Sequence, residues 1–373
     1  MSSTARHASN GVKVLLITAS WTGLLMLLYI NSYLLIGDLI SWGRLSGTND
    51  FWPDFWGNTV IGLVGGLVGG SFLVFSVNAG YRHKTFLSGI VRSVLTFLVT
   101  YMAIAVTVIF AMPFALYSLR SGVVEGTQRG WDNLVLNLYT PSFPVTAVLF
   151  GLVVAGTQFM LQVNDKFGPG VLWKLMTGKY YHPRDEERVF MFLDLRSSTE
   201  IAERIGHKRF FELLRELFQD VTKPVIDSFG DIYQYVGDEV VITWPVQLGI
   251  QNGNCIQCYF RIVEVLAEKR EEYVERFGVV PDFKAGLHVG EATVGEIGVV
   301  KKDIVYSGDV LNTTSRIQQE CNKYSVNLLA SADLVRRLVL APFYEARPLG
   351  EIRLRGKTEA LGLNEVRAVA AVA

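Results

Sequence analysis

The sequence predicts two fold classes in one chain, an all-α membrane region followed by an α+β domain. The 373 residues are 50% hydrophobic, and the apolar residues are concentrated before position 165, whereas the charged ones follow it. Four apolar runs in the first part approach the length of about 20 residues that a helix needs to span a bilayer. The second part alternates β-rich runs with amphipathic runs. We therefore expect a four-helix transmembrane domain at 1–163, a cytosolic coupling linker at 164–188 and an α+β domain at 189–373.

The four predicted spans are Val14–Ile36, Thr59–Asn78, Val94–Leu116 and Phe143–Val163. The first of them resembles a signal peptide only superficially. It is too long for the apolar core of a signal peptide, and no cleavage site of the A-x-A type follows it. We therefore interpret all four runs as membrane helices.

Basic residues between the spans predict the orientation of the chain. They precede the first span, lie between the second and third, and follow the fourth, whereas the first loop is mainly acidic. The residues concerned are Arg6, Lys13, Arg82, Lys84, Arg92, Lys166 and Lys174. Because basic loops stay on the cytoplasmic side, we expect a multi-pass protein of the inner (plasma) membrane. Its N-terminus and its second half would both be cytoplasmic.

Two features of the membrane half allow two interpretations each. In the second span, Gly62, Gly66 and Gly70 recur at every fourth position, a spacing that lets helices approach closely. The contact could lie within one helical unit or between two protomers. After the fourth span, Gly168-Pro169-Gly170 breaks the helix. The residues that follow could be a plain linker or a segment that couples the membrane helices to the second domain.

The second half begins with a predicted strand, helix and hairpin. The apolar run VFMFLDL, which contains Asp194, predicts a strand buried on both faces. Ser197 and Glu200 form an S-x-x-E pattern, which predicts a capping box at the start of a helix. The runs IYQYV and VVITW then flank Gly237 and Asp238, which predicts a tight hairpin with a positive φ at the glycine.

The remaining elements complete an α+β or α/β order around a central sheet. Apolar spacing predicts a long helix over Ile250–Phe277 and another over Asp309–Asn322. The predicted later strands are FKAGLHV, DIVYS, SVNLLAS, FYEARPL, EIRLRG and NEVRAV.

Two carboxylates occupy similar positions in this scheme. Asp194 ends one apolar strand, and Asp238 stands at the tip of the hairpin. Hard oxygen ligands of this kind bind Mg²⁺ or Mn²⁺, and such ions handle phosphates. The pair therefore predicts a divalent-metal site that acts on a phosphorylated substrate.

Five stretches occur in order in the second half: FMFLDLRSSTEIAERIG, IYQYVGDEVVITW, FKAGLHVGEATVGEIG, YSGDVLNTTSRIQ and IRLRGKTE. Together they resemble the catalytic domain of class III adenylate/guanylate cyclases. The Gly-Pro-Gly joint and the short membrane half resemble the four-span bacterial membrane-anchored members of that family. The resemblance implies a ferredoxin-like, palm-type fold with two active sites between two antiparallel-packed domains. A monomer should therefore be inactive.

The resemblance also implies roles for individual residues. The metal ligands, for two divalent cations per site, would be Asp194, Leu195 and Asp238, and the start of the following helix at Ser197, Ser198 and Thr199 would meet the phosphates. Asn312 and Arg316, four apart on one helix, would position the ribose and stabilise charge in the transition state. Lys357 would hold the terminal phosphates, and Arg355 could share that role.

Purine choice in the family rests on two positions, which Gln234 and Val305 occupy here. Neither matches the adenylate or the guanylate pattern, and an amide can face either purine edge. We expect ATP as substrate and 3′,5′-cyclic AMP with pyrophosphate as products, because bacterial members are mostly adenylate cyclases. The alternatives are a guanylate cyclase and an inactive nucleotide-binding signalling module.

Other side chains are assigned structural roles, and some partners are excluded. The net charge of zero gives no indication of nucleic-acid binding. Cys255 and Cys258 form an isolated C-x-x-C inside a predicted helix, where packing is favoured over metal or redox use. His288 lies within a predicted strand and is expected to be a satisfied core residue. Glu239 resembles part of the diguanylate cyclase signature, but the rest of that pattern is absent.

Overall fold

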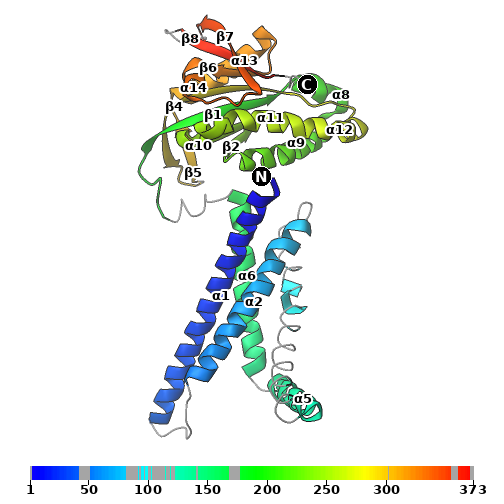
Figure 1. The fold of residues 1–373 in the computed structure, drawn as a ribbon, viewed down its shortest axis with the longest axis vertical. Coiled ribbons are helices and arrows are strands. Elements are labelled where there is room, and N and C mark those ends of the chain that lie inside the picture. The colour runs from blue at the N-terminus through cyan, green and yellow to red at the C-terminus, as the bar shows by residue number, and fades with distance from the viewer. Residues whose placement is uncertain are drawn as a thin grey trace. The chain divides into compact units, whose positions relative to one another are not determined.

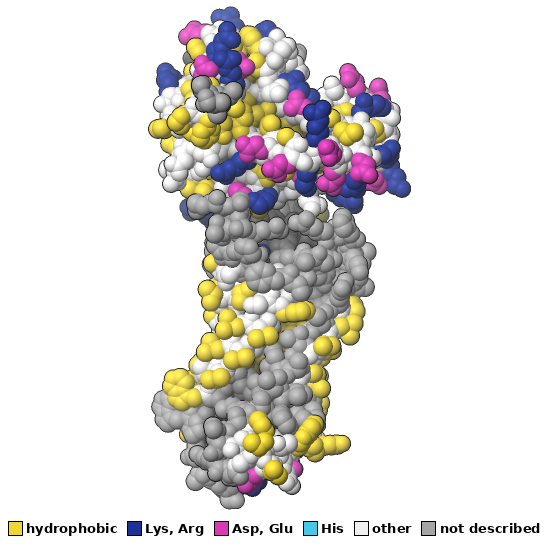
Figure 2. Space-filling view, turned by 45° about the vertical axis from the view of Figure 1, so that its right-hand side comes forward, with side chains coloured by type: hydrophobic (Ala, Val, Ile, Leu, Met, Phe, Trp, Pro, Cys, Tyr) yellow, Lys and Arg dark blue, Asp and Glu magenta, His cyan; other side chains and the backbone are white. Residues whose placement is uncertain are grey.

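The chain separates into two compact units, Met1–Trp173 and Lys174–Ala373. The structure, a computed structural model, describes residues 2–41, 51–80, 122–139, 142–167, 177–300, 302–353 and 360–369, with scattered positions between 91 and 118. Charged side chains concentrate on the second unit, and hydrophobic ones dominate the coloured surface of the first (Figure 2). The predicted domain boundaries at 163 and 188 remain predictions.

The described part of the first unit is helical. Its helices are α1 (Ser2–Ser41), α2 (Phe51–Gly80), α5 (Val123–Tyr139) and α6 (Ser142–Phe167) (Figure 1). Among the described residues, Gly11–Leu34 is the one stretch that is long and apolar enough to cross a membrane. Shorter apolar stretches lie at Gly62–Val74 and Ala147–Leu161. Most of the predicted span Val94–Leu116 lies outside the described residues, so four spans are not confirmed.

Helices α1 and α2 pack closely through the predicted glycine row. A Cβ atom on Gly62 would lie 2.9 Å from the Cα atom of Thr22, and one on Gly66 would lie 2.7 Å from that of Thr18. Such distances leave no room for any side chain other than hydrogen. The row therefore serves a contact within one chain, the first of the two interpretations.

The second unit is built on a mixed eight-stranded sheet. Along the sheet the order is β2-β3-β1-β4-β6-β8-β7, and β5 pairs with β4 outside this path. Strands β4 and β6 run parallel, and the other described pairs are antiparallel. The strands are β1 (Arg184–Leu195), β2 (Asp231–Val236), β3 (Glu239–Pro245), β4 (Phe283–Ile297), β5 (Asp303–Ser307), β6 (Leu328–Ser331), β7 (Tyr344–Ile352) and β8 (Leu361–Ala368).

Helices cover both faces of this sheet. They are α8 (Ser198–Ile205), α9 (His207–Asp227), α10 (Val246–Ile250), α11 (Asn254–Glu268), α12 (Arg270–Phe277), α13 (Asp309–Tyr324) and α14 (Ala332–Arg337). Figure 1 shows α9, α11 and α12 together on one side. Met191 and Leu193 of β1 join the core on that side, and Phe190 packs with Val310 of α13 on the other. The prediction that this strand is buried on both faces is confirmed.

Three local predictions are wrong. The helix expected over Ile250–Phe277 is interrupted near its start, where Asn252 and Gly253 have φ values of 54° and 65°, and again at Lys269. The capping box is not formed, because Ser197 has φ 51° and its side chain makes no capping hydrogen bond. FYEARPL and the start of EIRLRG belong to one strand, β7, which stays paired with β8 across an irregularity after Pro348.

We predict that Gly286→Ala lowers both stability and activity. A Cβ atom there would lie 2.8 Å from the Cα atom of Gln318, so α13 would have to move away from β4. Overpacking of this kind costs roughly 1–3 kcal/mol. The thermal unfolding midpoint of the second unit measures the effect.

The matched control is Gly295→Ala on the same strand, where the nearest atom to a new Cβ is a Pro183 side-chain carbon at 3.4 Å. Equal midpoints for the two variants would show that the β4–α13 contact is not tight.

Candidate active site

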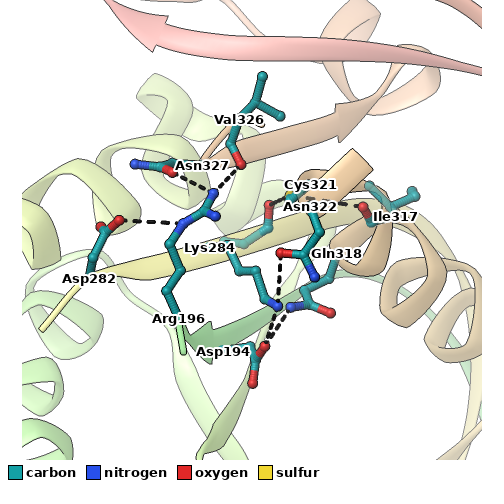
Figure 3. Close-up of polar contacts among 11 residues, drawn as sticks. Asp194, Arg196, Asp282, Lys284, Ile317, Gln318, Cys321, Asn322, Val326 and Asn327 are labelled. Atoms are coloured by element: carbon teal, nitrogen blue, oxygen red, sulfur yellow. Dashed lines mark hydrogen bonds and ion pairs between the residues drawn. The ribbon is translucent and has the colours of Figure 1, made fainter. Parts of the chain in front are cut away.

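Asp194 lies where β1, β4 and α13 meet. Its Oδ2 atom accepts a hydrogen bond from Gln318 Nε2 at 2.9 Å and forms an ion pair with Lys284 Nζ at 2.9 Å (Figure 3). Lys284 is the direct partner of Asp194 across the β1–β4 ladder, and it also donates to Asn322 Oδ1 at 3.2 Å. The carboxylate is therefore held from two neighbouring elements.

The hairpin brings Asp238 to the same place. Gly237 has the predicted positive φ, 63°, and Asp238 completes the two-residue turn between β2 and β3. In the β1–β3 ladder Asp194 faces Glu239. Asp238 directly precedes Glu239, and its charge raises the pKa of Asp194, so the two predicted aspartates lie close together.

Burial makes this cluster of carboxylates costly to ionise. Desolvation raises the pKa of Asp194, Lys284 lowers it, and Asp238 raises it again. Desolvation, followed by the charges of Asp194 and Asp238, raises the pKa of Glu239 to about 7. Three carboxyl groups share one nearby lysine, so the site has excess negative charge that a cation would relieve.

The donor set suits a Mg²⁺ or Mn²⁺ ion that also binds a substrate. Among the described residues no group of three or more His, Cys, Asp or Glu side chains is arranged to hold a metal by itself. Mg²⁺ is commonly bound through one or two carboxylates, with phosphate oxygens and waters completing its shell. Asp194 and Asp238 fit this pattern. The buried side chain of Leu195 has no donor, which leaves its main-chain carbonyl.

The chain after β1 offers unpaired main-chain groups. Helix α8 begins at Ser198, directly after the left-handed Ser197, and Ile201 N is bonded to Ser197 O at 2.9 Å. The amides of the first turn precede this first helical hydrogen bond. Because no side chain among the described residues caps them, they and the positive end of the helix are available to an anion.

The two predicted site residues on helix α13 lie on a different face of the helix from the residue that contacts Asp194 of the same chain. Asn312 is exposed, and Arg316 is half-buried with no hydrogen bond or ion pair among the residues that the structure describes. Gln318, which contacts Asp194, is two positions from Arg316 and so about 200° around the helix. Asn312 and Arg316 are four apart and share a face.

The two positions expected to choose the purine lie on β2 and β5. Gln234 is exposed on β2, and Val305 is half-buried on β5. Their neighbours join the strands, because Tyr306 N donates to Tyr233 Oη at 3.2 Å and the two rings meet edge to face with centroids 5.0 Å apart. Lys357 and Arg355 lie outside the described residues.

The minor candidates from the sequence have structural environments. Cys255 and Cys258 are completely buried, and burial raises the pKa of the Cys255 thiol to about 12, which favours packing over redox use. His288 Nδ1 lies 2.9 Å from Ser331 Oγ, which is consistent with a satisfied core residue.

Sequence reasoning missed Lys284 and Gln318. Lys284 stands in the predicted strand FKAGLHV, but its place opposite Asp194 depends on the strand register, which the sequence does not give. Gln318 belongs to the predicted helix, and only the packing of α13 on β1 brings it to the carboxylate. The one feature of the sequence that could have pointed to Gln318 is its polar side chain at a position on the predicted buried face of the helix.

Residues 180–364 match the family described as adenylate and guanylate cyclase catalytic domain. This part of the chain, just under half of the 373 residues, is therefore similar to the catalytic domain of adenylate and guanylate cyclases.

This chain covers less than two thirds of the length of the curated relatives described next. Adenylate cyclase 2 of Rhizobium meliloti (strain 1021) is 39% identical over 220 residues, which are 59% of this chain and 61% of that protein. Adenylate cyclase 1 of the same organism is 29% identical over 187 residues, 48% of this chain and 27% of the relative. A bacterial light-regulated adenylyl cyclase has a similar fold, with TM-score 0.52 and 17% identity over 61% of this chain and 66% of that one.

We predict that Lys284→Met shifts the pH dependence of Mn²⁺ binding to higher pH. Lys284 lowers the pKa of Asp194, so its removal lets protons compete with the metal up to a higher pH. Above the new midpoint binding should persist, because a neighbouring positive charge has been removed. The amplitude of the free Mn²⁺ paramagnetic resonance signal, recorded across pH, gives the midpoint. Lys284→Arg is the control and should keep the original midpoint, whereas an unchanged midpoint in Lys284→Met would remove Lys284 from the site.

Proposed function

We propose that this chain is a membrane-bound adenylate cyclase that converts ATP to 3′,5′-cyclic AMP and pyrophosphate. Catalysis would use two divalent cations, Mg²⁺ or Mn²⁺, at each site of a homodimer. The observation that carries the proposal is that Asp194 and Asp238 lie close together where β1 ends and β2 turns into β3, inside the part of the chain that matches the cyclase catalytic domain.

Each residue of the aspartate side has a task that follows from its position. Asp194 and Asp238, with the carbonyl of Leu195, would hold the ions. The ions, when bound, would lower the pKa of the ribose 3′-hydroxyl and neutralise charge on the triphosphate. The uncapped first turn of α8, Ser197–Thr199, would receive phosphate oxygens on its main-chain amides.

The second group of residues supports a site shared between two protomers. Arg316 has no ionic partner among the described residues and lies on a different face of α13 from Gln318, which already binds the same chain's Asp194. Arg316 would stabilise charge on the α-phosphate in the transition state, and Asn312 would position the ribose. Both would serve the aspartates of the partner protomer, as would Lys357 for the terminal phosphates. A guanidinium suits this task because it stays charged and presents a fork of donors.

ATP is proposed over GTP as the substrate. Two relatives, which are 39% and 29% identical to this chain, are named adenylate cyclases. Gln234 is exposed on β2 beside the Tyr233–Tyr306 contact, and its amide can both donate to and accept from an adenine edge. The side chain of Val305 could offer the purine base only an apolar contact. The same side chains do not exclude guanine, so a guanylate cyclase is the principal alternative.

Anchoring in the inner membrane is the second part of the proposal. Gly11–Leu34 of α1 is long and apolar enough to span a bilayer, and α2 and α6 contain shorter apolar stretches. With the basic residues between the runs, this supports four spans with both the N-terminus and the catalytic domain in the cytoplasm. The linker at 164–188 would join the two parts.

We predict that Asp194→Ala and Arg316→Ala chains are each inactive alone but active when mixed. In a mixed dimer one site would combine the intact aspartates of one chain with the intact arginine of the other. Random pairing of equal amounts should restore about a quarter of wild-type activity. Alone, Arg316→Ala should lower kcat by about a hundredfold to a thousandfold.

The matched control mixes Asp194→Ala with Asp238→Ala chains. Both substitutions affect the same half of a site, so every dimer retains two damaged sites and activity should stay absent. The shared site is contradicted if the first mixture remains inactive while differently tagged chains copurify, or if the control mixture regains activity.

A further inference from the structure

The two strands that carry the candidates for purine selection are not neighbours in the sheet. Gln234 lies on β2 and Val305 lies on β5. Among the described strands β2 pairs with β3 alone and β5 pairs with β4 alone, and β1 lies between β3 and β4. No ladder of hydrogen bonds between described residues therefore joins β2 directly to β5. Contacts between side chains are left to fix the position of Gln234 relative to Val305.

An irregularity in β2 turns one tyrosine toward β5. The β2–β3 register shifts between Ile232 and Gln234, which leaves Tyr233 as an extra residue in β2. An extra residue of this kind re-aims a side chain, and such bulges are common beside active sites. Ile232 packs against the core that includes α9, whereas Tyr233 packs against the cluster around Phe190 on the opposite face of the sheet.

The re-aimed Tyr233 contacts β5 through Tyr306. Tyr306 N donates a hydrogen bond to Tyr233 Oη at 3.2 Å, and the two rings meet edge to face with centroids 5.0 Å apart. Because the donor belongs to the main chain, the bond holds the strand β5 itself. Tyr233 directly precedes Gln234, and Tyr306 directly follows Val305. The contact therefore fixes the strand positions next to both candidates.

The guanidinium of Arg188, on β1, supports this contact. Arg188 is 3% exposed, and its Cζ atom lies 4.9 Å from the centre of the Tyr306 ring, whose face attracts a cation. It also donates to Thr243 Oγ1 and to Glu186 Oε2, each at 3.0 Å, and forms an ion pair with Asp231 Oδ2 at 3.5 Å. A buried charge needs such partners. They lie on β3, β1 and β2, so the guanidinium links β2 to the aromatic ring of β5.

We propose that Tyr233, held against Tyr306 with the support of Arg188, is a positioning residue that sets the choice between ATP and GTP. Adenine presents an amino donor where guanine presents a carbonyl acceptor. The amide of Gln234 can accept from the first or donate to the second. Which of the two it does depends on where β2 holds it relative to β5. The proposal rests on the proposed nucleotide cyclase activity and adds residues that do not themselves touch the base.

The test compares Tyr233→Phe with the matched control Tyr235→Phe in the full-length protein in lipid. The two tyrosines flank Gln234, and each substitution removes one hydroxyl group and keeps the ring. Tyr235 stacks instead on Phe218 of α9, with centroids 4.7 Å apart. The measured quantity is kcat/KM for the better nucleotide divided by that for the other, under Mn²⁺. Tyr233→Phe should lower this ratio by about threefold to tenfold, the worth of one hydrogen bond, mainly through KM. Tyr235→Phe should leave it unchanged.

Two substitutions of Arg188 test the support of the contact. Lysine keeps the positive charge but not the fork of donors, so Arg188→Lys should lower the ratio less than Arg188→Met does. The thermal unfolding midpoint identifies any variant that fails to fold. Tyr233→Phe, which leaves the ring and the guanidinium in place, decides the proposal if the Arg188 variants do not fold.

Three results would overturn the proposal. The first is an equal loss of kcat/KM for both nucleotides in Tyr233→Phe, which would show a structural role only. The second is the same fall of the ratio in Tyr235→Phe, and the third is a wild-type protein without preference for either nucleotide. A preference for GTP would contradict the proposed substrate, but the ratio would decide this proposal as before. If neither nucleotide is turned over, the proposed activity fails. The ratio is then taken from the dissociation constants of ATP and GTP, measured by displacement of a fluorescent nucleotide analogue.

Discussion

The structure depends on how the carboxylate of Asp194 is held at the end of the central strand. Strand β1 is buried on both faces and pairs with β3 on one side and β4 on the other. These two ladders place Asp194 between the hairpin that carries Asp238 and the strand that carries Lys284. The desolvation that raises the pKa of Asp194 is the consequence of that central position, and Lys284 offsets it. Gln318 donates a hydrogen bond to the same carboxylate. A rigid sheet thus keeps two repelling carboxylates together, which is the condition for capturing divalent cations.

Much of this site could be predicted from the sequence, because local rules decide it. The apolar run before Asp194 and the Gly237 turn have signatures that depend on a few neighbouring residues, and both appear as expected. Lys284 and Gln318 could not be predicted, since strand register and helix packing decide their contacts. The capping box failed for a related reason: the turn after β1 forces Ser197 into a left-handed conformation, which overrides its local preference.

In the membrane half, the glycine spacing predicted from the sequence is explained by the structure, but the predicted number of spans is not confirmed. Its glycine row was recognised from spacing, and the structure assigns it to the contact between α1 and α2. The number of membrane spans depends on the length of each apolar helix. Among the described residues, only Gly11–Leu34 is long and apolar enough to cross a membrane. Within the second unit, Tyr180 O accepts a hydrogen bond from Glu296 N of β4, and β4 pairs with β5, which carries Val305.

The most direct test of the account is turnover by the purified full-length protein, in lipid, with ATP and GTP in parallel under Mg²⁺ and under Mn²⁺. The account predicts cyclic AMP as the main product, formed only when a divalent cation is present. Cyclic GMP as the main product would contradict the assignment of ATP as substrate while leaving the metal site and dimer intact. No product from either nucleotide in a folded dimer would contradict the central claim and identify the domain as a nucleotide-binding signalling module.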